Sequence, residues 1–238
     1  MPRLALMIDL ERCTGCKSCE AACKSEHALG PTERHNRVVW LGSKLEENSD
    51  NNQALDFLAL ACQHCERPAC VRACPVSPKA ISKNKETGVV TVNEDACVGC
   101  GECVTACPYG AMGFDPDGRH AVKCDLCSDR RAEGAATTAC AAVCPTKAIT
   151  FGPRDELLKT TEANNREMIK NDPFLLGPAT IYLDRITNKQ EKFDAADRNS
   201  PKVIDSFTNI SIDDTVFPYG HSREAVSYTH LRAHETSP

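Results

Sequence analysis

The chain has 238 residues, which is room for one or two domains, and its formal net charge of −5 excludes a strongly basic nucleic-acid binder. Hydrophobic residues make up 41% and aromatic residues only 5%, whereas sixteen cysteines are present, so something other than hydrophobic burial must hold much of the chain together. No apolar run reaches the roughly eighteen residues of a membrane-spanning helix, and Asp9 interrupts the apolar start too early for a signal peptide, so we expect neither a span nor an export signal.

The first element in chain order is a tight group of cysteines, here called group one. It has the spacing C-x2-C-x2-C-x3-C and comprises Cys13, Cys16, Cys19 and Cys23. An insertion at residues 24–61 follows it. The middle of the insertion, residues 37–41, is predicted to form a strand, in which Trp40 either packs into the core, the favoured interpretation, or faces a partner. The polar residues 46–53 are typical of an exposed loop.

Groups two and three are separated by a turn and a strand. Group two has the spacing C-x2-C-x4-C-x3-C, precedes Pro75, and comprises Cys62, Cys65, Cys70 and Cys74. Residues 86–88 form a predicted turn that leads into an apolar strand at residues 89–92. Group three repeats the spacing of group one, precedes Pro108, and comprises Cys97, Cys100, Cys103 and Cys107.

Group four and a cysteine-free extension complete the chain. Group four has a long x12 gap in its middle, precedes Pro145, and comprises Cys124, Cys127, Cys140 and Cys144. Residues 155–170 are predicted to be helical, residues 174–183 become strand-like, and residues 188–202 are polar and loose. The extension is interpreted as a cover for the cofactor edges or as a docking arm for a partner. Residues 226–238 resemble translated sequencing-adapter read-through, and we expect them to be non-native.

Disulfides, structural zinc and iron–sulfur clusters compete for these cysteines. Disulfides belong to secreted chains, and cysteines two or three positions apart are poorly placed to bridge one another. Tetrahedral zinc takes two well-separated pairs, or pairs with histidines, whereas here three cysteines come in one tight turn and the fourth lies one helical turn further on. The pattern favours iron–sulfur clusters over both alternatives.

The run C-x2-C-x2-C-x3-C-P of group three resembles the cluster-binding run of bacterial ferredoxins. The resemblance implies that three cysteines of a group wrap one 4Fe–4S cluster, while the fourth, on a short helix stopped by proline, ligates a neighbouring cluster. Sixteen thiolates make four complete sites, so we expect four 4Fe–4S clusters. Cys103 occupies the third position of group three, which gives no reason to expect a three-iron cluster.

The same resemblance pairs group two with group three, and group one with group four around them. The expected fold is α+β: two nested ferredoxin-like modules in residues 1–153, the inner one at about residues 55–118, followed by an extension at residues 154–220 and a disordered end at residues 221–238. The expected ligand sets are Cys13, Cys16, Cys19 and Cys144 for cluster 1; Cys124, Cys127, Cys140 and Cys23 for cluster 2; Cys62, Cys65, Cys70 and Cys107 for cluster 3; and Cys97, Cys100, Cys103 and Cys74 for cluster 4.

The combination of CTGCKSCEAACKSEH, CQHCERPACVRACP, CVGCGECVTACPYGAM and KCDLC…CAAVCPTKAI is highly specific. It resembles the iron–sulfur electron-transfer subunit of molybdopterin oxidoreductases of the dimethyl-sulfoxide, polysulfide, thiosulfate and tetrathionate reductase type. The match covers about residues 5–152 and includes the departure in which group one ends Cys23-Lys24 rather than Cys-Pro. In that family, groups one and four, and groups two and three, share modules.

The resemblance implies a non-catalytic subunit that relays electrons. A large catalytic subunit with a molybdenum or tungsten pterin would do the chemistry, and a membrane-anchor subunit, where present, would exchange electrons with quinone. The chain would be membrane-associated through these partners, or cytoplasmic. The side of the membrane stays open, because such subunits can be exported with a signal-bearing partner. The alternatives are an iron–sulfur subunit of a hydrogenase, carbon-monoxide dehydrogenase or formate-hydrogen-lyase complex, and a free polyferredoxin.

No catalytic constellation stands out, because the histidines at positions 27, 35, 64 and 120 are isolated in the sequence. His64 is interpreted as a hydrogen-bond donor near a cluster rather than a ligand, since the cysteines already complete four sites. Four lysines flank the ligands and are either ordinary solvated side chains or raise cluster potentials: Lys17, Lys24, Lys123 and Lys147.

Overall fold

The computed structural model describes residues 2–31, 33–40 and 57–184. The loop expected at residues 46–53, the loose segment at 188–202, the end of the chain from residue 221 and the side chain of Trp40 lie outside the described residues. Within the described part, short strands and short helices alternate, which agrees with the expected α+β class.

A three-stranded sheet brings the first strand together with segments from far along the chain. Its order is β8-β1-β9, formed by β1 (Leu4–Asp9), β8 (Ile149–Pro153) and β9 (Ile181–Leu183). The central strand β1 runs antiparallel to β8 and parallel to β9. Apolar residues dominate β1, and it is buried along most of its length because both of its faces are covered: Leu6 and Ile8 pack into one apolar cluster and Ala5 into another.

Three hairpins supply the remaining strands. They pair β2 (Asn36–Trp40) with β3 (Phe57–Ala61), β4 (Ile81–Lys83) with β5 (Val90–Val92), and β6 (Gly113–Asp115) with β7 (His120–Val122), all antiparallel. The strands predicted near residues 37–41 and 89–92 are therefore confirmed. A short strand follows each of Pro75, Pro108 and Pro145 in the chain, namely β4, β6 and β8.

The helices are short and are built around the cysteines. They are α1 (Ser18–Glu26), α2 (Ala69–Ala73), α3 (Glu102–Ala106), α4 (Ser128–Ala132), α5 (Ala139–Val143) and α6 (Arg154–Ala163). The prediction that the fourth cysteine lies on the helix was wrong for groups two, three and four. Cys74, Cys107 and Cys144 each follow the last helical residue in an extended conformation, because a residue before proline is disfavoured in helical geometry.

The helix expected at residues 155–170 is shorter than predicted. α6 ends at Ala163, where Asn165 adopts a positive φ of 50° and Asn164 donates its side-chain amide to the Thr160 carbonyl oxygen at 2.9 Å. Asparagine tolerates left-handed geometry and competes for backbone carbonyls, so two in succession end the helix. Met168, within the predicted helical range, is instead 49% exposed and forms a backbone bridge to Leu183.

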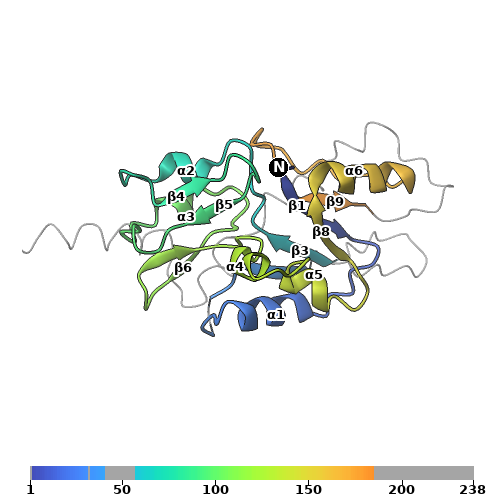
Figure 1. Ribbon diagram of the computed structural model, residues 1–238, viewed down its shortest axis with the longest axis horizontal. Helices are drawn as coiled ribbons and strands as arrows, with labels where there is room; N and C mark the ends of the chain where they lie inside the picture. Colours follow the sequence, from blue (N-terminus) through green and yellow to red (C-terminus); the bar gives the residue numbers. More distant parts are fainter. Residues whose placement is uncertain (1, 32, 41–56, 185–238) are drawn as a thin grey trace, which may run out of the picture.

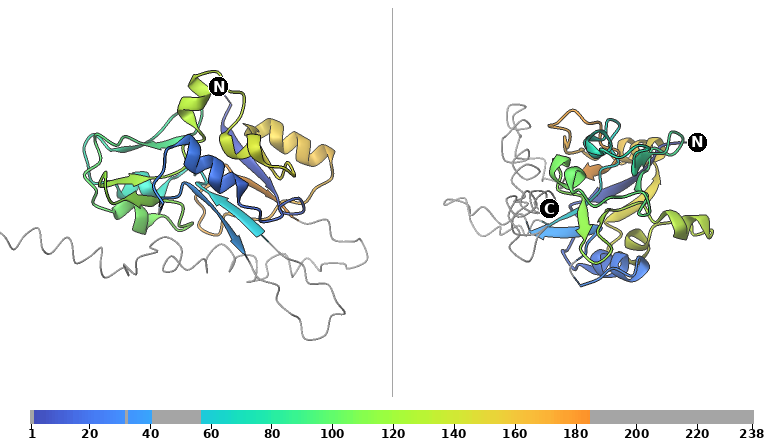
Figure 2. Two further views of the ribbon diagram at one scale, coloured as in Figure 1. Left: turned by 90° about the horizontal axis from the view of Figure 1, so that it is seen from below. Right: turned by 90° about the vertical axis from the view of Figure 1, so that its left-hand side faces the viewer.

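The elements of groups two and three gather at one end of the molecule, and the three-stranded sheet with α6 lies at the other (Figure 1). α1 and α5 pack against each other, and α1 also contacts β2 (Figure 2). Buried cysteines are part of both larger apolar cores, one around β1 and β3 and one around α2, α3 and β4. No helix in the described ranges is long and apolar enough to cross a membrane.

Candidate functional site

Each cysteine group opens with a loop that takes the same backbone turn. The residue directly before the second cysteine has a positive φ in every group: Gly15 69°, His64 42°, Gly99 68° and Leu126 59°. A β-carbon at Gly99 would lie 2.3 Å from the Arg119 carbonyl oxygen, so this position requires glycine. His64 and Leu126 are each only 1% exposed, so tight packing holds their less favourable geometry. Sequence reasoning missed this shared turn, although the glycines of groups one and three were a signal.

The thiols of groups one and four lie together between α1 and α5. Burial raises the pKa of Cys13, and the neighbouring thiols of Cys144 and Cys16 raise it further. Burial also raises the pKa of Cys23, and the next largest contributions come from Cys140 and Cys127. Cysteines far apart in the sequence therefore share these surroundings.

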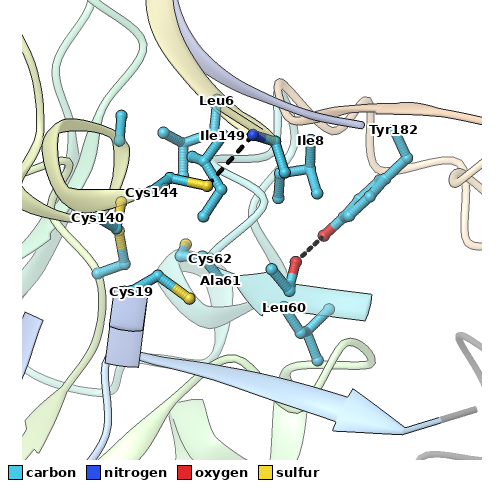
Figure 3. Packing of buried hydrophobic residues seen from close by; sticks show 14 of the residues in the cluster. Leu6, Ile8, Cys19, Leu60, Ala61, Cys62, Cys140, Cys144, Ile149 and Tyr182 are labelled. Atoms are coloured by element: carbon cyan, nitrogen blue, oxygen red, sulfur yellow. Dashed lines mark hydrogen bonds between the residues drawn. The ribbon is translucent and has the colours of Figure 1, made fainter. Parts of the chain in front are cut away.

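Cys19 lies at the junction of these thiols. Burial raises its pKa to about 12, with Cys140 as the next cause and Cys13 among the smaller ones. Figure 3 shows Cys19, Cys140 and Cys144 close together beside the core residues of β1 and β8.

A third set of thiols combines group two with the last cysteine of group three. Burial raises the pKa of Cys65 to about 12, followed by the thiols of Cys62, Cys107 and Cys70. For Cys70, burial again comes first and raises the pKa to about 12, followed by Cys62 and Cys107. The four side chains therefore surround one another.

A fourth set lies around α3. Burial raises the pKa of Cys103 to about 12, and the thiols of Cys100, Cys70 and Cys97 contribute next. Cys74 shares one buried apolar cluster with Cys103, against which Cys97 packs. The structure thus places all sixteen predicted ligands among other cysteines, and none of them forms a disulfide.

The chemistry of these donor sets fits a multinuclear metal cofactor. Crowded, buried thiols with raised pKa values stay protonated at neutral pH unless cations stabilise the thiolates. Backbone amides already point at several sulfurs, with the N–H of Ala148 3.2 Å from Cys144 Sγ (Figure 3). Comparable contacts run from Leu126 to Cys124 Sγ at 3.5 Å and from Ala139 to Cys127 Sγ at 3.5 Å. Such N–H groups stabilise anionic sulfur.

His64 supplies a further test of the fit. The Val90 N–H donates to His64 Nδ1 at 3.0 Å, so the ring proton is on Nε2, and burial lowers the His64 pKa well below its usual range. Nε2 is buried and has no hydrogen-bond partner among the described residues. A buried donor without an acceptor costs about 1–3 kcal/mol. A sulfur-rich cofactor held by Cys62 and Cys65 would supply an acceptor, which agrees with the donor role expected for His64.

Two histidines interpreted as isolated lie beside the thiols instead. The rings of His27 and His35 are 4.8 Å apart, and both can reach Cys23. His27 Nε2 lies 3.7 Å from Cys127 Sγ and 3.6 Å from Asp125 Oδ1. Sequence reasoning could not find this contact, because residues 27 and 127 meet only through the packing of the fold.

The four thiol sets differ in exposure, and in the third set only Cys107 is half-buried. Cys16 is exposed and Cys13 is half-buried. Cys97 and Cys100 are half-buried, and Val98 between them is 66% exposed. By contrast, Cys23, Cys124, Cys127 and Cys140 are all buried. Groups one and three therefore contain cysteines that reach the surface, whereas the set around Cys23 is enclosed.

Comparison with known proteins agrees with these donor sets. The family model described as a 4Fe-4S dicluster domain matches residues 53–154, and the 4Fe-4S binding domain model matches residues 4–25. The chain is 42% identical over 156 residues to the B subunit of the anaerobic dimethyl sulfoxide reductase of Escherichia coli strain K12, covering 64% of this chain and 74% of that protein.

Two further relatives have related names. The thiosulfate reductase electron transfer subunit PhsB of Salmonella typhi is 32% identical over 187 residues, which cover 79% of this chain and 95% of that protein. The B subunit of the polysulfide reductase of Wolinella succinogenes is 35% identical over 150 residues, which cover 63% and 76%. These matches, together with the thiol sets, identify the cofactors as 4Fe–4S clusters rather than zinc.

Proposed function

Because the chain belongs to the family of iron–sulfur electron-transfer subunits of molybdopterin oxidoreductases, we propose that it relays electrons through four 4Fe–4S clusters between a molybdopterin catalytic subunit and a second redox partner. The clusters supply one-electron transfer when bound. The chain's own residues hold them, exclude water and set their spacing. The relatives named for dimethyl sulfoxide, thiosulfate and polysulfide reductases do not favour the alternatives, a hydrogenase, carbon-monoxide dehydrogenase or formate-hydrogen-lyase subunit or a free polyferredoxin.

The proposed ligand sets are those of the sequence analysis. Support for cluster 1 comes from the proximity of Cys13 to Cys144, and support for cluster 2 from that of Cys23 to Cys140. The proximity of Cys65 to Cys107 supports cluster 3. The proposed ligands are Cys13, Cys16, Cys19 and Cys144 for cluster 1; Cys124, Cys127, Cys140 and Cys23 for cluster 2; Cys62, Cys65, Cys70 and Cys107 for cluster 3; and Cys97, Cys100, Cys103 and Cys74 for cluster 4.

Electrostatic influences between thiols of different sets, which act over short distances, support a single line of clusters in the order 1–2–3–4. Cys19 of the first set is influenced by Cys140 of the second. Cys124 of the second set is influenced by Cys62 of the third. Cys103 of the fourth set is influenced by Cys70 of the third. The exposed ends are then Cys16 at cluster 1 and the loop around Val98 at cluster 4, where partners would exchange electrons with the chain.

Packing of helices and pairing of strands support two nested modules within residues 1–153. For the outer module, α1 packs on α5 and β1 pairs with β8. For the inner module, proposed at about residues 55–118, α2 packs on α3 and β4 pairs with β5. In the described part of the proposed extension (residues 154–220), β9 adds an edge strand to the sheet of the outer module, and α6 packs against that sheet. This favours the cover interpretation of the extension over a free docking arm.

The proposed partners are a large catalytic subunit with a molybdenum or tungsten pterin at one end of the line and, where present, a quinone-reactive membrane-anchor subunit at the other. Relatives named as B subunits of reductases support a multi-subunit complex. Membrane association would then come through the partners.

The observation that carries this function is the gathering of sixteen free cysteines, most of them buried, in the described part of the chain. The test is anaerobic affinity purification of the tagged chain from its native host, with iron, sulfide, molybdenum and tungsten assayed together. We expect about sixteen irons from this chain (four clusters of four) and a large pterin-containing partner. A nickel-containing partner, or a chain that purifies alone with its iron, would contradict the proposal.

A further inference from the structure

A lysine side chain is buried in the interior between two of the proposed cluster sites. Lys123 is only 4% exposed, and its Nζ donates hydrogen bonds to the carbonyl oxygens of Val90 and Cys124. It forms no ion pair with a carboxylate of the described residues. A buried ammonium with no anionic partner is costly, so its charge needs compensation from another source.

The hydrogen bonds of Lys123 belong to a continuous path between the second and third sites. At one end, Nζ contacts the carbonyl oxygen of Cys124, a proposed ligand of cluster 2. At the other end, Nζ contacts the carbonyl oxygen of Val90, whose N–H donates to His64 Nδ1 at 3.0 Å. The backbone N–H of His64 then donates to Cys62 Sγ, a proposed ligand of cluster 3, at 3.4 Å.

Lys123 lies between the two sites: its Nζ contacts the carbonyl oxygen of Cys124 on one side, and on the other side it is linked through Val90 and His64 to Cys62. A 4Fe–4S cluster with four thiolates is negative in its oxidised state and gains a further negative charge on reduction. Two such anions flanking one ammonium would supply the missing compensation, and the ammonium would stabilise the reduced form of each.

We propose that Lys123 is a positioning residue shared by clusters 2 and 3, whose buried charge raises the reduction potentials of both and whose hydrogen bonds hold their loops together. The inference deepens the proposed function and rests on its cluster assignments. It also separates Lys123 from the other three flanking lysines of the sequence: Lys17 and Lys147 are exposed, and Lys24 donates to the carbonyl oxygens of Gly30 and Pro31.

Lys79 is a matched control. Its Nζ donates to the carbonyl oxygen of another proposed ligand, Cys74, at 2.7 Å, and to that of Arg72 at 3.2 Å. Lys79 is exposed, however, so water screens its charge. Both lysines contact the carbonyl oxygen of a proposed ligand, but only Lys123 is buried. The comparison therefore tests whether burial of the charge is what matters.

The experiment compares Lys123→Gln, Lys123→Arg and Lys79→Gln with the unaltered full chain, purified anaerobically with its clusters. Iron and sulfide assays come first, followed by redox titration with electron paramagnetic resonance detection. We expect Lys123→Gln to lower two of the four midpoint potentials and leave the other two in place. Lys123→Arg, which keeps the positive charge, should leave these two midpoint potentials close to those of the unaltered chain. Lys79→Gln should leave all four midpoint potentials close to those of the unaltered chain.

The outcomes separate this proposal from the function on which it rests. An unaltered chain without four clusters overturns the proposed function itself. A fully loaded Lys123→Gln variant with four unchanged potentials, or with all four lowered alike, overturns only the role of Lys123. If Lys123→Gln cannot retain its clusters, Lys123→Arg decides: full loading with unchanged potentials supports a required charge, and loss of clusters in this variant too overturns the proposal, because a positive charge at this position then does not preserve the sites.

Discussion

At the scale of single residues, the cluster loops depend on backbone conformations that most side chains disfavour. The position before the second cysteine is left-handed in all four groups, and two groups use glycine there. Where the chain places His64 or Leu126 instead, burial of the side chain accompanies the strained backbone. The local turn that aims three thiols inward is thus maintained either by glycine or by packing.

Gly99→Ala should damage the group-three loop. Its φ of 68° costs alanine about 1–2 kcal/mol, and the added β-carbon would meet the Arg119 carbonyl oxygen at 2.3 Å. Gly134→Ala is the control, because Gly134 also has a positive φ, 98°, but a β-carbon there meets nothing within 4 Å. We expect Gly99→Ala to lose its cluster absorbance at a lower temperature than Gly134→Ala. Equal temperatures for the two variants would show that the clash is absorbed.

At the scale of elements, residues after α6 fasten the extension to β1 and β3. Arg166 forms a two-pronged ion pair with Asp9 at the end of β1, with both Nη–Oδ distances at 2.8 Å. Tyr182 in β9 is fully buried, and its hydroxyl donates to the Ala59 carbonyl oxygen at 3.4 Å (Figure 3). Up to residue 184, the extension therefore packs into the core around β1 and β3.

Removal of the Arg166 side chain should destabilise the protein by about 2–3 kcal/mol, because the buried Asp9 carboxylate loses its main partner. Arg12→Ala is the control. Arg12 also faces Asp9, but at 3.7 Å and with 58% of its side chain exposed, so its loss should cost less than about 1 kcal/mol. Anaerobic urea denaturation measures both variants. An Arg12 variant as unstable as Arg166→Ala would refute the distinction.

Tyr182→Phe tests the hydrogen bonds of β9 separately from its packing. The change removes the acceptor of the Gln63 side-chain amide, 3.0 Å away, and the donor to Ala59, at a cost of about 1 kcal/mol. Tyr182→Leu should cost about 3 kcal/mol, since it also leaves a cavity. The same urea titration compares them, and a phenylalanine variant as unstable as the leucine variant would contradict the assignment.

At the scale of the whole molecule, cysteines proposed to hold the clusters are also members of the two larger apolar cores. Five cysteines belong to the larger apolar cluster and three to the second, among aliphatic residues with few aromatic rings: Cys19, Cys62, Cys124, Cys140 and Cys144, then Cys70, Cys74 and Cys103. The clusters would bridge strands and helices that bury little surface on their own.

Removal of iron should therefore unfold the chain. After oxidation in the presence of a chelator, we expect loss of the cooperative thermal transition and of most of the native circular dichroism, because buried thiols lose the ions that joined them. Reconstitution with iron and sulfide should restore both signals. An iron-free chain with native circular dichroism and a cooperative transition would show that the apolar cores suffice.

The sequence by itself determined the four cysteine groups, the class of cofactor, the family, and the short strands and helices around each group. These follow from local rules, since ligand spacing and proline positions act over a few residues. The end of α6 at Ala163 escaped this reasoning, because the Asn164–Asn165 pair outweighed the apolar spacing that continued beyond it.

Only the tertiary structure decided which charged and polar groups meet the thiols. His27 reaches Cys127, Arg166 reaches Asp9, and the Lys123 side chain is buried while Lys147 stays exposed. Each outcome depends on segments brought together across the fold, such as β1 with β8 and α1 with α5. Most ligands within a group follow one another at short spacings that can be seen in the sequence, whereas burial and long-range charge arise only when distant elements pack.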